Sequence, residues 1–184
     1  MLLVLSITMG LFVGIIFGVS YGWYAYKNAE TKVKGSTVNE VPTIIFGQTE
    51  YIYSNATMPI YDDDRYNYAN KNSFTITLND NLKNYQTGVK IILKDIVMAD
   101  ELKVANYKYE LLEDGVTVGS GDFSTIGSAK EIELMPMKVL NPVTYPQTYN
   151  YDLLIWLSED ESDQNYLMDK KFRAKINVIS AVKK

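Results

Sequence analysis

Carboxylates are the side chains of this sequence best suited to chemistry, and they occur in two dense groups. Asp62, Asp63 and Asp64 are consecutive and precede Arg65; the second group comprises Glu159, Asp160, Glu161 and Asp163. Such groups could bind calcium, which takes six to eight oxygen ligands, or supply a carboxylate pair for glycoside hydrolysis. The spacing of an EF-hand loop is absent. We therefore interpret the first group as a solvated loop and the second as a charged hairpin loop that protects a β edge from pairing.

The residue types that are missing restrict the chemistry further. The 184 residues include no histidine and no cysteine. This excludes catalysis by Ser-His-Asp or Cys-His groups, H-E-x-x-H metalloprotease sites, thiolate nucleophiles and disulfide scaffolds. The net charge of −4, without an evident basic stripe, argues against nucleic-acid binding. We predict that the protein is not an enzyme, and we assign no catalytic, cofactor-binding or metal-binding residue and no cofactor.

Tyrosines form a third noticeable group. Five of them lie close together among Asn and Asp residues: Tyr51, Tyr53, Tyr61, Tyr66 and Tyr68. Carbohydrate-binding and protein-binding surfaces use aromatic platforms of this kind, but ordinary packing of strands explains the cluster as well, and we favour packing. Asn55-Ala-Thr57 fits the glycosylation sequon and receives little weight.

The elements that must position these residues are β-strands, because apolar side chains beyond residue 40 recur with period two. Residues 172–178 alternate between apolar and polar types. Residues 149–157 are apolar on both faces, which predicts a central strand with Trp156 largely buried. Further strands are predicted at residues 74–78, 89–93, 107–112, 116–118 and 130–135, the last closed by Pro136.

Turn signals separate these strands. Asp114-Gly115 predicts a hairpin because both residues tolerate positive φ. The glycines of residues 119–121 suggest a bulge or strand end, and single helical turns are expected within residues 98–104 and 163–169. Seven to nine short strands without a long amphipathic helix predict an all-β fold, a jelly-roll-like antiparallel β-sandwich over residues 41–184.

An apolar segment precedes this domain. Residues 1–19 carry no charge and are long enough to enter a bilayer. We expect residues 1–20 to form one transmembrane or signal helix that contacts the lipid bilayer, either a retained anchor or a signal peptide that is cleaved. Residues 21–40 are expected to be an aromatic and polar connector or a first strand. Lysines follow the segment, but we expect the domain on the extracellular side of the cell membrane, or secreted.

Both ends of the chain resemble a known family. Residues 18–31, Gly-Val-Ser-Tyr-Gly-Trp-Tyr-Ala-Tyr-Lys-Asn-Ala-Glu-Thr, resemble the stretch after the signal segment in the camelysin and TasA-like family of Gram-positive surface proteins. Residues 149–178 are similar to the closing hairpin of related secreted proteins. The resemblance implies a jelly-roll-like sandwich, export, and assembly into biofilm fibres by donation of an N-terminal strand. Camelysin's metalloprotease activity is not carried over, because this chain has no histidine.

The function expected from these features is that of an exported, surface-displayed structural or adhesive protein, including a fibre, biofilm-matrix or pilin-like subunit. Its partners would be other proteins or further copies of itself. The alternative is a membrane-anchored module that binds a ligand or protein as the accessory subunit of a larger complex.

Overall fold

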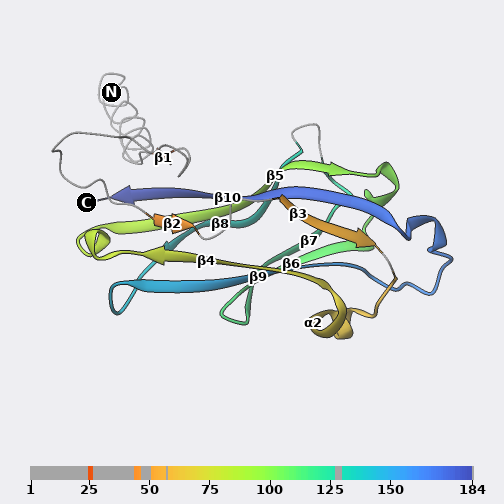
Figure 1. The fold of residues 1–184 in the computed structure, drawn as a ribbon, viewed down its shortest axis with the longest axis horizontal. Helices are drawn as coiled ribbons and strands as arrows, with labels where there is room; N and C mark the ends of the chain where they lie inside the picture. Colours follow the sequence, from red (N-terminus) through yellow and green to blue (C-terminus); the bar gives the residue numbers. More distant parts are fainter. Residues whose placement is uncertain (1–24, 27–43, 47–50, 57, 127–129, 184) are drawn as a thin grey trace, which may run out of the picture.

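The computed structural model describes residues 25–26, 44–46, 51–56, 58–126 and 130–183 (Figure 1). Within them the chain forms mainly strands, joined by short helical turns: η1 (Asp62–Asp64), α2 (Arg65–Tyr68), η2 (Asp80–Leu82), η3 (Asp100–Leu102) and η4 (Asn165–Leu167). The strands are β1 (Ala25–Tyr26), β2 (Ile44–Phe46), β3 (Tyr51–Ala56), β4 (Asn70–Leu78), β5 (Gln86–Met98), β6 (Tyr107–Glu113), β7 (Val116–Asp122), β8 (Ile132–Leu140), β9 (Gln147–Leu157) and β10 (Lys170–Lys183).

Two antiparallel sheets make up a sandwich, as the sequence predicts. Sheet A has the strand order β1-β10-β5-β8, with β3 also paired to β10, and sheet B has the order β2-β4-β9-β6-β7. In Figure 1 the strands of sheet A lie above those of sheet B, with α2 at the lower right. From β3 to β10 consecutive strands alternate between the sheets, except for the β6–β7 hairpin.

The core lies between the sheets and is built by the predicted alternation. In β10, Phe172, Ala174 and Ile176 are buried while Arg173 is exposed. β9 lies between β4 and β6, which confirms that residues 149–157 form a central strand. Its inward side chains join the main core, and its outward side chains Leu154 and Trp156 form a second apolar cluster with Leu112. Removing each such side chain from water contributes about 1.5–3 kcal/mol.

The predicted hairpin at Asp114-Gly115 is confirmed. These residues have φ values of 47° and 84° and join β6 to β7. The expected irregularity near residues 119–121 is a bulge, because the pairing shifts by one residue between Leu111 and Leu112. Gly119 also has a tertiary role: a Cβ there would lie 1.7 Å from the carbonyl oxygen of Leu134 in β8. Glycine therefore allows the edge strands β7 and β8 of the two sheets to approach each other.

Two sequence predictions about strand ends are wrong. Pro136 does not close its strand, since β8 continues to Leu140. β8 is the edge of sheet A, and its pairing with β5 shifts between Val89 and Ile91, where Pro136 falls. Proline is tolerated at an edge or bulge because its missing N–H breaks no ladder hydrogen bond there. Likewise, β9 and β10 do not form a closing hairpin, because they belong to different sheets.

The helical turns expected within residues 98–104 and 163–169 are confirmed as η3 and η4. Residues 1–20, expected to form a membrane helix, lie outside the described residues, as does most of the 21–40 connector. Ala25 and Tyr26, which lie within the expected connector or first strand (residues 21–40), form β1 and pair with Ala181 and Ser180 of β10. In the described part of the chain, no helix combines the length and apolar character needed to cross a bilayer.

Candidate functional site

Residues 58–69, which we call the tyrosine loop, connect β3 to β4 across the outer face of sheet B. Ile60 and Ala69 pack on the second apolar cluster of Leu112, Leu154 and Trp156. The backbone N–H of Ile60 donates to the Leu157 carbonyl at 2.9 Å, and the Ile60 carbonyl accepts from the N–H of Glu159 at 2.9 Å. The loop therefore covers apolar side chains that the sheet would otherwise expose.

Asp62 anchors the centre of this loop. Its Oδ1 accepts hydrogen bonds from Trp156 Nε1 at 2.9 Å and Ser158 Oγ at 2.8 Å, and its Oδ2 pairs with Lys108 Nζ at 2.7 Å. Partial burial raises the pKa of Asp62, but the hydrogen bonds from Lys108, Trp156 and Ser158 outweigh this and lower the pKa to about 2. All three aspartates are exposed, as the solvated-loop interpretation predicts, and Asp62 in addition anchors the loop through its hydrogen bonds.

Arg65 fixes the next turn of the loop. It forms an ion pair with Glu110, whose side chain is 6% exposed, and it donates to the Asp62 carbonyl at 2.6 Å. Burial raises the pKa of Glu110, but the hydrogen bonds from Arg65 and Thr117 lower it overall. Arg65 also donates to the Tyr66 hydroxyl at 2.7 Å and lies 4.2 Å from the centre of the Tyr66 ring. A buried carboxylate in β6 thereby orients an exposed tyrosine.

The prediction that the five clustered tyrosines pack as ordinary strand residues is wrong for four of them. The exposed fractions are 62% for Tyr53, 61% for Tyr61, 54% for Tyr66 and 71% for Tyr68. Tyr51 alone is partly covered, by cation–π contacts with Arg173 and Lys175 of β10. The reason is their place in the chain: three of them lie on the tyrosine loop, outside both sheets. The structure thus leaves the aromatic platform as the better interpretation.

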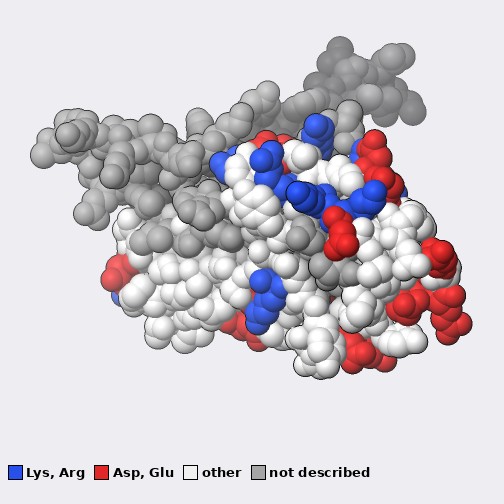
Figure 2. Space-filling model, turned by 45° about the vertical axis from the view of Figure 1, so that its right-hand side comes forward, with Lys and Arg blue, Asp and Glu red and all other residues white. Residues whose placement is uncertain are grey.

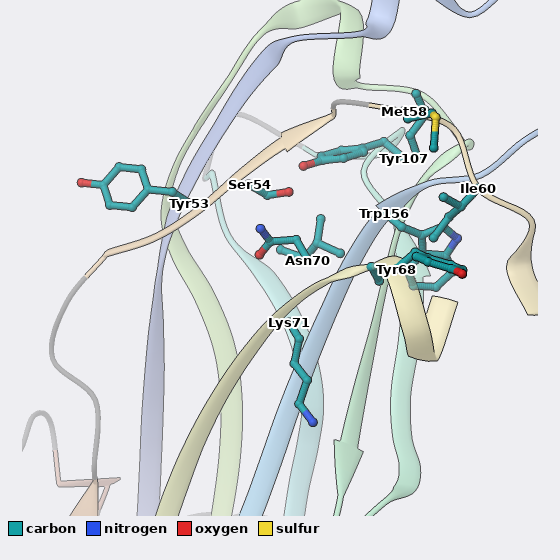
Figure 3. Close-up of a pocket in the computed structure, with 12 residues that line it drawn as sticks. Tyr53, Ser54, Met58, Ile60, Tyr68, Asn70, Lys71, Tyr107 and Trp156 are labelled. Atoms are coloured by element: carbon teal, nitrogen blue, oxygen red, sulfur yellow. The ribbon is translucent and has the colours of Figure 1, made fainter. Parts of the chain in front are cut away.

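A cavity of about 530 Å³ opens between β3 and β4, beside the tyrosine loop (Figure 3). Its floor includes Tyr107, Ile155 and Leu157 from the core, and Asn70 lies on its β4 side. Tyr68 and Trp156 both line the cavity, whereas Figure 3 shows the Tyr53 ring pointing away from it. The side of β4 facing away from β9 is paired with β2 only at residues 76–78, and no described strand continues that pairing toward Asn70. The sandwich is therefore open on this side.

The most unusual group in the cavity is the hydroxyl of Tyr107. The side chain is fully buried, its hydroxyl faces Ser54 (Figure 3), and no other described residue offers it a hydrogen bond. Burial raises the pKa of Tyr107, and the neighbouring Ser54 hydroxyl offsets this only in part. A buried hydroxyl without a well-formed hydrogen bond costs about 1–3 kcal/mol.

A second surface of interest is the outer edge of β10. β3 pairs with residues 170–175 along this edge, and β1 pairs with residues 180–181. No described strand pairs with the outer edge at residues 176–179. β1 contributes only two residues, so its pairing adds few ladder hydrogen bonds. Unpaired strand edges accept strands from other chains.

Charge is unevenly distributed over the molecule. Figure 2 shows Lys and Arg gathered in the upper part of one face and Asp and Glu along its right-hand margin. One contribution comes from β10, where Arg173 and Lys175 share the outward face and Lys94 of β5 is paired opposite Lys175. The sequence analysis did not detect this basic group because Lys94 is distant in the chain. The prediction that the protein binds no nucleic acid remains a prediction.

The other residues singled out by the sequence form no site. Glu159, Asp160 and Asp163 accept hydrogen bonds from N–H groups two residues further along their own loop, while Glu161 is exposed. These contacts stabilise the β9–β10 connection. Across the described ranges, no three Asp or Glu side chains are grouped so that they could hold a metal ion. The sequon is only partly described, because Thr57 lies outside the described residues.

Comparison with known proteins does not identify a family. No protein-family model matches the chain, and no curated protein is significantly similar to it. Among solved structures, the chain is similar to dimeric latent PorU from Porphyromonas gingivalis, with a TM-score of 0.39 and 12% sequence identity. The match covers 81% of this chain but 14% of PorU, and a similarity this distant carries no argument. The resemblance to the camelysin and TasA-like family stays an expectation.

Proposed function

We propose that this protein is an exported, surface-displayed structural or adhesive protein, without enzymatic activity, built on a jelly-roll domain. The strand order supports the jelly-roll class: β3, β10, β5 and β8 are neighbours in one sheet and β4, β9, β6 and β7 in the other, as expected when paired Greek keys close. The apolar residues 1–19 support export through or anchoring in a membrane. The absence of histidine and cysteine from the sequence supports a non-catalytic role.

The observation that carries the structural role is the pairing of β1 with the edge of β10. Ala25 pairs with Ala181 and Tyr26 with Ser180, and the ladder ends after these two residues. Exchange of such a segment between copies recreates the same contacts in trans, which is an inexpensive route to assembly. Residues 21–26 are the stretch expected to be donated; because β1 is antiparallel to β10, residues before Ala25 would add main-chain hydrogen bonds beyond Ala181, toward the C-terminal end of β10.

Single cysteines test strand exchange cleanly, because the natural chain has none. One preparation would carry Tyr26→Cys and a second Ser180→Cys, two positions that face each other across the β1–β10 pair. Exchange predicts that mixing and oxidising them gives a disulfide-linked dimer with one chain of each kind. The matched control pairs Tyr26→Cys with Val143→Cys, since Val143 is 96% exposed but lies on the β8–β9 connection.

The same two positions can also be used to block strand exchange. A chain carrying both substitutions should form an intrachain disulfide that locks β1 onto its own β10 and prevents polymers from forming in size-exclusion chromatography. If the mixed single variants gave no more dimer than the Val143 control, strand exchange would be refuted. Export has its own test: protease added to intact cells should release the domain, and a domain protected until lysis would contradict an outside location.

A second candidate function is an accessory binding module. It is favoured by the exposed tyrosines of the tyrosine loop and by the adjoining cavity. A protein that remains monomeric after residues 21–26 are freed, and that binds a soluble ligand, would favour this candidate over the structural one.

A further inference from the structure

The tyrosine loop is rigidly held, although three large side chains on it face solvent. Asp62 has three side-chain partners, Arg65 is paired with Glu110, and Ile60 is bonded on both sides to the β9 end. Tyr61, Tyr66 and Tyr68 are each more than half exposed. Fixing a loop before binding lowers the entropy lost in the complex. The arrangement therefore presents preorganised aromatic faces to a partner.

The composition of the loop indicates what kind of partner fits. From residue 61 to the end of the loop and the first residue of β4, the sequence reads Tyr-Asp-Asp-Asp-Arg-Tyr-Asn-Tyr-Ala-Asn, in which tyrosine rings alternate with carboxylates and amides; the loop's branched aliphatic residue, Ile60, packs on the sheet. A flat sugar ring has an apolar C–H face that stacks on an aromatic ring and hydroxyls at its edge that bond carboxylates and amides. A protein partner with an apolar contact core needs exposed aliphatic side chains to pack against, and Met58 is the one that the described residues of this loop provide.

The cavity extends this surface inward. Tyr68 is one of its lining residues (Figure 3), and the polar groups that line it include the Asn70 amide and the Ser54 hydroxyl. At about 530 Å³ the cavity has the size of a small-ligand site.

The negative charge of the loop restricts which sugars it can bind. Asp63 and Asp64 are exposed and form no ion pair within the described part of the chain, whereas the loop's Arg65 is already paired with Glu110. Glu159 follows directly on the contact with Ile60 and adds a further carboxylate. Acidic polymers would be repelled by this local field.

We infer that the tyrosine loop and the adjoining cavity form a binding site for uncharged polysaccharides, with Tyr66 and Tyr68 as stacking platforms and Asn70 and Ser54 as hydrogen-bonding groups. This inference deepens the binding-module candidate and does not require strand exchange. It also gives the adhesive role a ligand of defined chemistry.

Affinity gel electrophoresis of the purified full chain tests the inference. The neutral probes are laminarin, hydroxyethyl cellulose and glycol chitin that has been fully N-acetylated, and polygalacturonate is the acidic probe. Retardation by at least one neutral polymer, but not by polygalacturonate, is expected. Tyr68→Ala should weaken that retardation about tenfold and Tyr66→Ala should also weaken it, since stacked aromatic anchors dominate such contacts.

Tyr166→Ala is the matched control, because Tyr166 is 60% exposed but lies in η4, outside the tyrosine loop. It should leave retardation unchanged. Trp156 emission, compared with the unsubstituted chain, checks that each variant keeps the loop in place. The inference is overturned if no neutral polymer retards the chain, if polygalacturonate binds as well, or if Tyr166→Ala and Tyr68→Ala have equal effects. Binding of unstructured peptides without any polysaccharide would assign the site to a protein partner instead.

Discussion

Two substitutions at Asp62 separate the contributions of its contacts. In Asp62→Asn, the side-chain oxygen can still accept from Trp156 and Ser158, because both bonds go to Oδ1. The new amide replaces Oδ2 and faces the Lys108 ammonium, so the ion pair is lost. Asp62→Ala removes all three contacts and leaves the Trp156 and Ser158 donors, which are both buried, without partners. The alanine variant should therefore be clearly the less stable of the two.

The expected losses of stability follow from the pKa of Asp62 and from the burial of the Trp156 and Ser158 side chains. A pKa of about 2, against the ordinary value of 3.8 for an aspartate, corresponds to about 2.4 kcal/mol of the free energy of unfolding at 1.36 kcal/mol per pKa unit. The Asp62 side chain is 47% exposed, so solvent screening reduces this to about 1 kcal/mol for Asp62→Asn. Asp62→Ala should cost about 2–3 kcal/mol, because unpaired buried donors are expensive.

The stabilisation contributed by the Asp62 carboxylate depends on pH. The pKa of Asp62 is lower in the folded state, so its contribution is present above the unfolded pKa of 3.8 and is lost as the pH falls through about 2. Urea denaturation followed by Trp156 emission, in a Trp23→Phe background, measures this. At neutral pH the free energy of unfolding should be lower for Asp62→Ala than for Asp62→Asn. Near pH 2, the free energies of unfolding of the unsubstituted protein and of Asp62→Asn should approach each other. If the difference in free energy of unfolding between the unsubstituted protein and Asp62→Asn did not change with pH, the reasoning would be refuted.

Three other outcomes are expected. Trp156→Ala should cost about 3–5 kcal/mol, and Trp156 should emit at the short wavelengths of a shielded indole; emission typical of an indole in water would contradict its burial. Gly119→Ala should destabilise the fold by about 1–3 kcal/mol or more, because the new Cβ would meet the Leu134 carbonyl. In urea denaturation it should cost more than Gly115→Ala, where a Cβ meets no atom within 4 Å and the cost is the backbone strain of a side chain at a φ of +84°. Purified protein should show no zinc-dependent, chelator-sensitive cleavage of casein, because it lacks histidine.

The sequence by itself determined the fold class and most of the strands. The period-two alternation of residues 172–178 identified one strand, and the segment 149–157, apolar on both faces, identified a central strand. Both identifications work because strand geometry places successive side chains on opposite faces. Asp114-Gly115 determined a hairpin for an equally local reason, since both residues take positive φ. Each of these features depends on a few consecutive residues, so a single sequence can carry them.

Only the tertiary structure decided how distant segments meet. Asp62 and Trp156 are 94 positions apart, and nothing near either residue indicates their hydrogen bond. The five tyrosines look alike in sequence, but three lie on a loop fixed by Arg65 and Glu110, and this contact keeps them at the surface. β9 and β10 follow each other along the chain yet belong to different sheets. Pairing partners are set by packing between the sheets, which brings together residues that share no local pattern.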